Sequence, residues 1–108
     1  MLNFSNNYIS SEQISNLVWS INQMNNLTYL NLSSNQIGNE GIILLTNNLP
    51  SSIQRLNLSE NEITEEGIIY FSNYLNKLPN LLSFAIYGNK NGTSGLSNLL
   101  KGFKETPY

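Results

Sequence analysis

The segment LTYLNLSSNQIGNEGIILLTNNL, residues 27–49, decides the fold of this chain. Its first half alternates apolar and polar residues, with Leu30 and Leu32 on the apolar side of the pattern. A period of two is typical of a half-buried strand. The second half carries apolar residues at the spacing of one helical face: Ile42, Leu45 and Leu49. The segment therefore predicts a strand that is followed by a helix.

The same pattern occurs four times along the chain. Residues 53–68, IQRLNLSENEITEEGI, match LTYLNLSSNQIGNEGI at 27–42, with an offset of 26 residues. Residues 2–14 and 81–96 are weaker copies, each offset by 28 residues from its neighbouring copy. Self-similarity at such a period is the signature of stacked repeats. We expect a single domain over residues 1–108, with repeats near these ranges: 1–25, 26–51, 52–79 and 80–104.

Helix signals follow the strand in each copy. Thr64 is expected to cap the helix of the third copy, where Glu65 and Glu66 are favoured by the helix dipole. Pro50 and Pro79 are expected to end the second and third helices. Apolar residues recur at helical spacing in the other copies: Ile14, Leu17 and Ile21; Ile68, Phe71 and Leu75; Leu96, Leu99 and Phe103.

One asparagine stands at the same place in every copy, and we call these residues the Asn ladder: Asn7, Asn35, Asn61 and Asn89. The turn from strand to helix is irregular backbone, and its buried polar groups need partners. An Asn amide supplies both donors and an acceptor. We therefore expect a structural role for the ladder and not a ligand site. An apolar replacement would cost roughly 1–3 kcal/mol for each backbone group left unsatisfied.

The pattern LxxLxLxxNxI resembles a leucine-rich repeat. The longer forms LNLSSNQIGNEGIILL and LNLSENEITEEGIIYF are similar to the ribonuclease-inhibitor-like subclass, which has repeats of about 28 residues with a helix in each. The resemblance implies an α/β solenoid of about four repeats, with a short parallel sheet on the concave face and helices on the convex face. It also implies a non-enzymatic protein–protein interaction module that binds a protein partner.

Composition excludes several classes of function. Five Lys and Arg residues against seven Glu give a net charge of −2, and no basic stripe is present. Nucleic acid and an anionic membrane surface are therefore not expected as partners. The chain has no His, Cys or Asp. Zinc sites built from Cys and His and Ser-His-Asp or Cys-His catalysis are thereby excluded, so we expect no enzyme, no cofactor and no metal.

Targeting signals are also missing from the sequence. The start, MLNFSNNYISSEQ, has neither the basic residues nor the apolar run of a Sec-type signal peptide. No apolar stretch is long enough for a transmembrane helix. The surplus of Asn, Ile and Ser resembles that of repeat proteins among the effectors of intracellular bacteria. We therefore expect a cytoplasmic protein, or one in the host cytosol if it is a secreted effector.

Candidate binding residues alternate with the strand leucines and should point out of the concave face. They form three columns: Tyr29, Arg55 and Ser83; Asn3, Asn31, Asn57 and Ala85; Ser5, Ser33, Ser59 and Tyr87. The small polar residues in these columns are also explained as solvent-exposed positions of the repeat consensus. Tyr and Arg are enriched at interface hot spots. Tyr29, Arg55 and Tyr87 are therefore the first candidates, with Asn31 and Asn57 between them.

Trp19 is an alternative contact on the convex side. It lies about 140° around the first helix from Ile14, which puts it off the buried stripe. It is expected either to lie partly flat against a neighbouring helix or to contact a partner or a second copy.

Two further expectations concern the repeat ends and the competing functions. A solenoid needs caps, so the uncapped repeat ends indicate either a homodimer or a piece of a longer array. The Ran GTPase-activating protein has the same repeat subclass, and Arg55 or Asn57 would then touch a nucleotide site. The third alternative is a purely structural fragment that extends a longer array.

Overall fold

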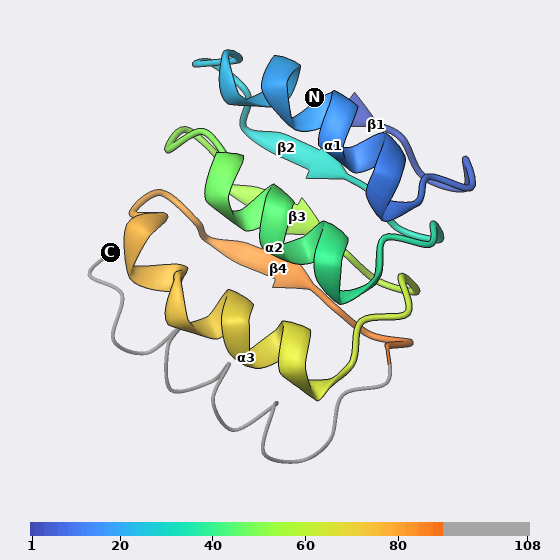
Figure 1. Ribbon diagram of the computed structural model, residues 1–108. Helices are drawn as coiled ribbons and strands as arrows, with labels where there is room; N and C mark the ends of the chain where they lie inside the picture. Colours follow the sequence, from blue (N-terminus) through green and yellow to red (C-terminus); the bar gives the residue numbers. More distant parts are fainter. Residues whose placement is uncertain (90–108) are drawn as a thin grey trace.

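The computed structural model describes residues 1–89 of the 108-residue chain, and in them strands and helices alternate (Figure 1). The strands are β1 (Leu2–Asn3), β2 (Tyr29–Asn31), β3 (Arg55–Asn57) and β4 (Ser83–Ala85). The helices are α1 (Ser11–Asn22), α2 (Gly38–Asn48) and α3 (Glu65–Asn73), followed by the 3₁₀ turn η1 (Leu75–Lys77). The helix predicted around Leu96, Leu99 and Phe103 lies outside the described residues.

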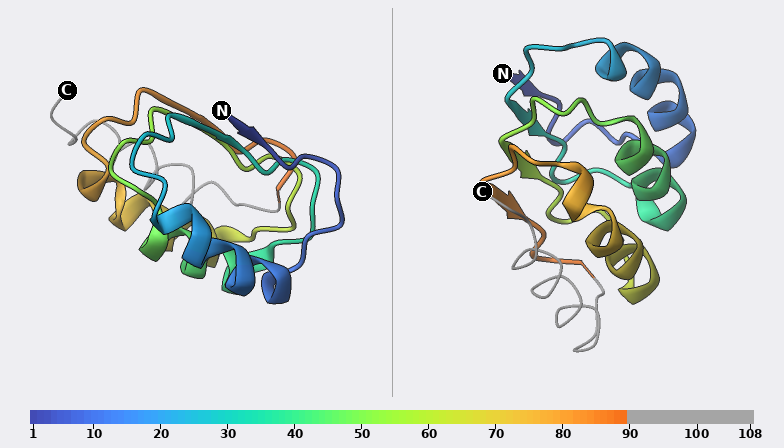
Figure 2. Two further views of the ribbon diagram at one scale, coloured as in Figure 1. Left: turned by 90° about the horizontal axis from the view of Figure 1, so that it is seen from above. Right: turned by 90° about the vertical axis from the view of Figure 1, so that its left-hand side faces the viewer.

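The strands form one parallel sheet in the order β1-β2-β3-β4, so each strand lies next to the strands of the adjacent repeats. The register aligns Leu30 with Leu2 on one side and with Leu56 on the other, and Leu56 with Phe84. The three helices α1, α2 and α3 cover the same face of the sheet, as the views from above and from the side show (Figure 2). The repeat architecture predicted from the sequence is confirmed.

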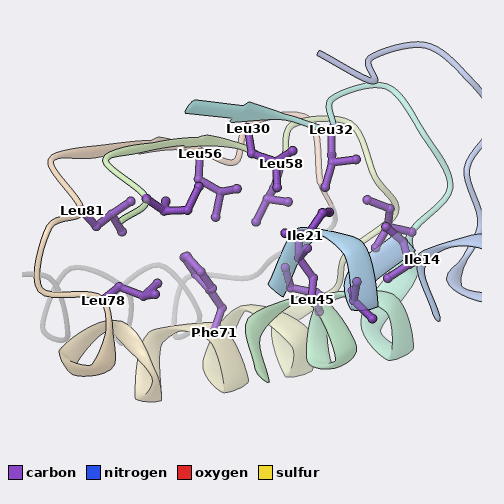
Figure 3. Packing of buried hydrophobic residues seen from close by; sticks show 14 of the residues in the cluster. Ile14, Ile21, Leu30, Leu32, Leu45, Leu56, Leu58, Phe71, Leu78 and Leu81 are labelled. Atoms are coloured by element: carbon purple, nitrogen blue, oxygen red, sulfur yellow. The ribbon is translucent and has the colours of Figure 1, made fainter. Parts of the chain in front are cut away.

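The core fills the space between sheet and helices (Figure 3). The strand leucines and the inward residues of the helices are almost fully buried: Leu30, Leu32, Leu56 and Leu58; Ile14, Ile21, Leu45 and Phe71. Leu17 and Leu49 are only half-buried, whereas Val18 is buried. Leu49 follows the end of α2 in extended conformation, so it has left the helical face that the spacing predicted.

The helix ends depart in two places from the sequence-based expectation. Thr64 is the N-cap residue of α3, as predicted, but its hydroxyl accepts a 2.6 Å hydrogen bond from Asn39 Nδ2 and makes no capping hydrogen bond within α3. The expectation that Pro79 ends α3 is wrong, because the helix stops at Asn73. The chain then tightens into η1, where the N–H of Lys77 donates to the carbonyl of Tyr74 at 3.0 Å.

Asn35 uses its whole side-chain amide between two repeats. Its Oδ1 accepts from the backbone N–H groups of Asn7 and Ile9, each at 2.9 Å, in the preceding repeat. Its Nδ2 donates to the carbonyl of Phe4 in that repeat and to the carbonyl of Leu32 in its own, each at 3.0 Å. Nδ2 also donates to the Ser33 carbonyl at 3.2 Å, so one buried side chain supplies partners to five backbone groups.

The next ladder residues repeat this geometry. Asn61 Nδ2 donates to the Leu32 carbonyl at 2.8 Å, and Asn89 Oδ1 accepts from the N–H groups of Asn61 and Ile63 at 2.8 and 3.0 Å. Asn7 differs, because it is exposed and its amide reaches only the carbonyls of its own repeat. The ladder thus links each described turn to its neighbour.

The residue before each ladder asparagine has positive φ: Asn6 at 61°, Ser34 at 57°, Glu60 at 56° and Gly88 at 72°. This left-handed conformation costs a residue with a side chain roughly 1–2 kcal/mol. A serine and a glutamate nevertheless adopt it, so the turn geometry is imposed by the stacking of the repeats. Local residue preference alone would not predict it.

Candidate functional site

The concave face is the sheet face that points away from the helices. Strand register places two of the predicted columns on it: Tyr29, Arg55 and Ser83; Asn3, Asn31, Asn57 and Ala85. Tyr87 follows β4 and has an exposed fraction of 66%. The backbone carbonyl of Tyr87 accepts from the N–H of Glu60 at 2.9 Å, so Tyr87 lies at the carboxyl ends of the strands. Tyr29 and Arg55 lie at the opposite ends.

Tyr29 and Arg55 contact each other across the strands β2 and β3. The guanidinium carbon of Arg55 lies 5.0 Å from the centre of the Tyr29 ring. Such a cation–π contact contributes about 0.5–1 kcal/mol at an exposed site. Tyr29 is half-buried and Arg55 is exposed, so the ring serves as a support beneath an accessible guanidinium.

A hollow of about 310 Å³ opens beside this pair. It is lined by Tyr29, Arg55, Leu56, Asn57, Ser83, Phe84 and Ala85. Ser83 and Ala85 are small, which leaves space next to the larger side chains. Tyr29, Arg55 and Asn57 are among the binding residues predicted from the sequence, whereas Ser83 is not, although its place in the first column is visible there. The hollow therefore gathers three of the five proposed concave-face residues, and Asn31 and Tyr87 lie outside its lining.

The third predicted column does not hold at Ser59. Its side chain is fully buried, and its hydroxyl has no hydrogen-bond partner within residues 1–89. The physical reason is the end of β3. Asn57 Oδ1 accepts from the Ser59 N–H at 3.1 Å, which bends the chain into a turn. Strand alternation therefore no longer decides where the Ser59 side chain points.

The convex side presents Trp19, whose exposed fraction is 71%. The expectation that it lies flat against a neighbouring helix is therefore wrong. Tyr8 is exposed as well, at 79%, and its φ of 57° is unusual for an aromatic residue. Tyr8 is not among the binding residues predicted from the sequence. A signal was present, because the equivalent positions in the next two copies are the polar residues Gln36 and Glu62.

A second hollow, of about 230 Å³, lies between α2 and η1, and its lining includes Tyr74 and Lys77. The rings of Tyr70 and Tyr74 stack with centroids 4.9 Å apart, and Lys77 Nζ lies 4.7 Å from the Tyr74 centroid. The neighbouring Tyr70 raises the pKa of Tyr74, chiefly through a side-chain hydrogen bond. The spacing of four residues between the tyrosines places them on one helical face.

Charge is segregated in the described part of the chain. The glutamates all lie in the strand-to-helix turns or in the first helical turns: Glu12, Glu40, Glu60, Glu62, Glu65 and Glu66. Arg55 and Lys77 lie toward the opposite ends of the strands and the helices. Within residues 1–89 neither cation forms an ion pair, and each lies over a tyrosine ring.

No cluster of acidic side chains in the described range could hold a metal ion. No helix within residues 1–89 is long and apolar enough to cross a bilayer.

Comparison with known proteins agrees with the repeat architecture. A family profile described as Leucine Rich repeat matches residues 23–45 and 50–72, which contain β2 and β3 with most of the helices that follow them. No curated protein matches the chain. Among solved structures, 31 chains match.

One similar structure is "Leiomodin-1 Actin-Binding Site 2 (ABS2)", with a TM-score of 0.82 and 18% sequence identity. The match covers 97% of this chain and 64% of that chain, and at this identity it shows the fold alone. Each central repeat has a strand, the ladder asparagine and a helix in the same order. Residues 23–45 and 50–72 are therefore leucine-rich repeats, and the described part of the chain has the leucine-rich-repeat fold.

Proposed function

We propose that this chain is a non-enzymatic module that binds a protein partner on its concave face. Leucine-rich-repeat domains are typically protein-binding and generally not catalytic. The observation that carries the proposal is the Tyr29–Arg55 pair beside a hollow of about 310 Å³, on a surface that is otherwise built from small residues. Tyrosine and arginine at the centre of a depression are typical of interface hot spots.

Rigidity favours the concave face over the convex one. The residues of the pair stand on adjacent hydrogen-bonded strands, and Tyr29 is already half-buried. A partner therefore needs to immobilise little of this surface, which lowers the entropic cost of binding.

Trp19 is a weaker candidate because it is isolated. The residues three and four positions away along α1 and its C-cap are all exposed and polar: Ser15, Asn16, Asn22 and Gln23. A single exposed aromatic residue without apolar neighbours is common on protein surfaces.

The similar leiomodin-1 structure is described as an actin-binding site. It supplies a precedent for a protein-binding site on this fold. The proposal for this chain does not include actin, because the likeness concerns the fold.

The test is affinity capture with quantitative mass spectrometry, using three forms of the chain. The wild type and a Trp19→Ala variant should capture the same partner. A triple variant with Tyr29→Ala, Arg55→Ala and Tyr87→Ala should lose it, while its circular dichroism spectrum stays that of the wild type. Capture that persists in the triple variant and disappears in Trp19→Ala would move the binding site to the convex side.

A further inference from the structure

We infer that the concave face recognises an acidic side chain, Asp or Glu, on an extended segment of its partner, through Arg55 supported by Tyr29. This inference rests on the proposed function and adds the chemistry of the bound segment. It starts from the hydrogen-bonding groups that line the hollow of about 310 Å³.

The hollow presents donors that lack acceptors. Within residues 1–89 the Arg55 guanidinium forms no ion pair or hydrogen bond, and its contact is the Tyr29 ring at 5.0 Å. Asn57 uses its Oδ1 for the Ser59 N–H at 3.1 Å, and within residues 1–89 its Nδ2 donates to no acceptor. An ionised carboxylate is a pure acceptor with two oxygens and matches this set.

Arginine geometry favours a carboxylate in particular. The planar guanidinium carries parallel N–H donors that bind the two carboxylate oxygens in a bidentate manner. Stacking on the Tyr29 ring limits the orientations of the guanidinium before a ligand arrives, so less rotational freedom is lost on binding.

The negative net charge of the chain does not oppose this assignment. The glutamate nearest to Arg55 in sequence is Glu60, which lies past the end of β3 and past the turn that begins at Asn57. The glutamates within residues 1–89 lie in the strand-to-helix turns or in the first helical turns, whereas Arg55 begins β3 at the opposite end of the strand. The local charge of Arg55 therefore decides the sign of the ligand.

The arrangement of the residues that line the hollow favours a peptide segment in extended conformation. Tyr29, Arg55 and Ser83 form a row across three strands, so a segment that crosses the strands meets these residues in turn. The small side chains of Ser83 and Ala85 leave room for one acidic side chain beside Arg55.

The experiment selects binders from a phage-displayed library of random dodecapeptides on the immobilised wild-type chain. We expect an Asp or Glu at one position of the selected sequences. In synthetic peptides with amidated C-termini, changing that residue to Asn or Gln should weaken binding at least about 10-fold, which corresponds to about 1.4 kcal/mol. The amidated ends exclude a terminal carboxylate as the bound group.

A charge swap gives the sharper result. Arg55→Glu should abolish binding of the acidic peptide. The same variant should bind a peptide in which the acidic residue is changed to Lys. Arg55→Lys keeps the charge but loses the bidentate geometry, so binding should fall to an intermediate level. Arg55 is exposed, so these variants should retain the wild-type unfolding temperature within a few degrees.

A bulky substitution in the hollow distinguishes the carboxylate inference from the proposal that the concave face binds a protein. Ala85→Trp fills the hollow and should abolish peptide binding in either case. If it does so while the acid-to-amide change and the charge swap have no effect, the carboxylate inference is wrong and the concave-face proposal stands. If Ala85→Trp and Tyr29→Ala leave binding unchanged, or if no peptide is selected, both proposals are contradicted.

Discussion

The buried amide of Asn61 illustrates how much one side chain contributes to this fold. Its Nδ2 donates to the carbonyls of Leu32, Leu58 and Ser59 at 2.8, 3.2 and 3.1 Å. In Asn61→Leu a side chain of similar size fills the space, but each of those carbonyls loses one of its donors. The Ile37 N–H, which donates to Asn61 Oδ1 at 3.4 Å, also loses its acceptor. Unsatisfied buried groups cost about 1–3 kcal/mol each. We expect the free energy of unfolding, measured by urea denaturation, to fall by about 2–4 kcal/mol.

Asn7 supplies the matched control within the same ladder. Its side chain is exposed, and its Nδ2 donates to the carbonyls of Phe4 and Ser5 near solvent. Water can replace those bonds, so Asn7→Leu should cost less than about 1 kcal/mol. Equal losses in the two variants would mean that burial does not determine the contribution of the ladder.

Individual positions also show where sequence reasoning stops. The ladder positions could be read from the repeat, because each turn needs an inward amide. The burial of Ser59 could not, because it depends on a turn that begins at Asn57. The positive φ of Glu60 could not be predicted either, because the neighbouring repeats impose a conformation that glutamate disfavours.

Helix packing depends on a close approach at Gly67 in α3. A Cβ at this position would collide with the Oδ1 of Asn39 and the Cγ2 of Ile63. Gly67→Ala gains about 1 kcal/mol of helix propensity. Overpacking costs about 1–3 kcal/mol and would also displace the Asn39 amide from Thr64, to which it donates at 2.6 Å. We expect a net loss of stability, seen as a lower midpoint of thermal unfolding.

The control for this substitution is Asn16→Ala on the exposed side of α1. Without a tertiary contact to disturb, the change should show propensity alone and raise stability by a few tenths of a kcal/mol. If Gly67→Ala raises stability as much, then α2 and α3 are not held at the distance that the structure shows.

Helices could be located from the sequence, since their apolar spacing reflects the core they face. Their ends were harder to predict. The tightening of the chain into η1 after Asn73 depends on i to i+3 bonds such as Tyr74 N–H to Phe71 carbonyl at 3.0 Å. No residue near Asn73 signals a helix stop, and Pro79 acts only after η1.

The stacked arrangement explains why part of the candidate site could be predicted. Once the repeat offset is known, the parallel register follows, and it places Tyr29 beside Arg55. The hollow could not be predicted, because it depends on the relative sizes of side chains from three strands and on the pose of Arg55 over the Tyr29 ring. The repeat period predicts which residues are neighbours on adjacent strands, whereas the shape of the surface depends on how their side chains pack.

Stacking also predicts how the molecule opens. Among the strands of residues 1–89, β1 has a single neighbour, and the Phe4 N–H donates to the Asn31 carbonyl across that interface. The Leu32 N–H donates to the Asn57 carbonyl at 2.9 Å, so freeing it requires separating both β1 and β2 from β3. Repeat stability is roughly a sum of nearest-neighbour terms. We expect the Phe4 amide to exchange with deuterium at least about 10-fold faster than the Leu32 amide.

Low concentrations of urea provide the internal check on this exchange gradient, followed by NMR for each amide. The larger opening that frees Leu32 exposes more surface, so its exchange rate should rise more steeply with urea than that of Phe4. Equal rates and equal urea slopes for the two amides would show that the described repeats open as one cooperative unit. In that case the interfaces between repeats, and not the repeats themselves, would dominate the stability of the chain.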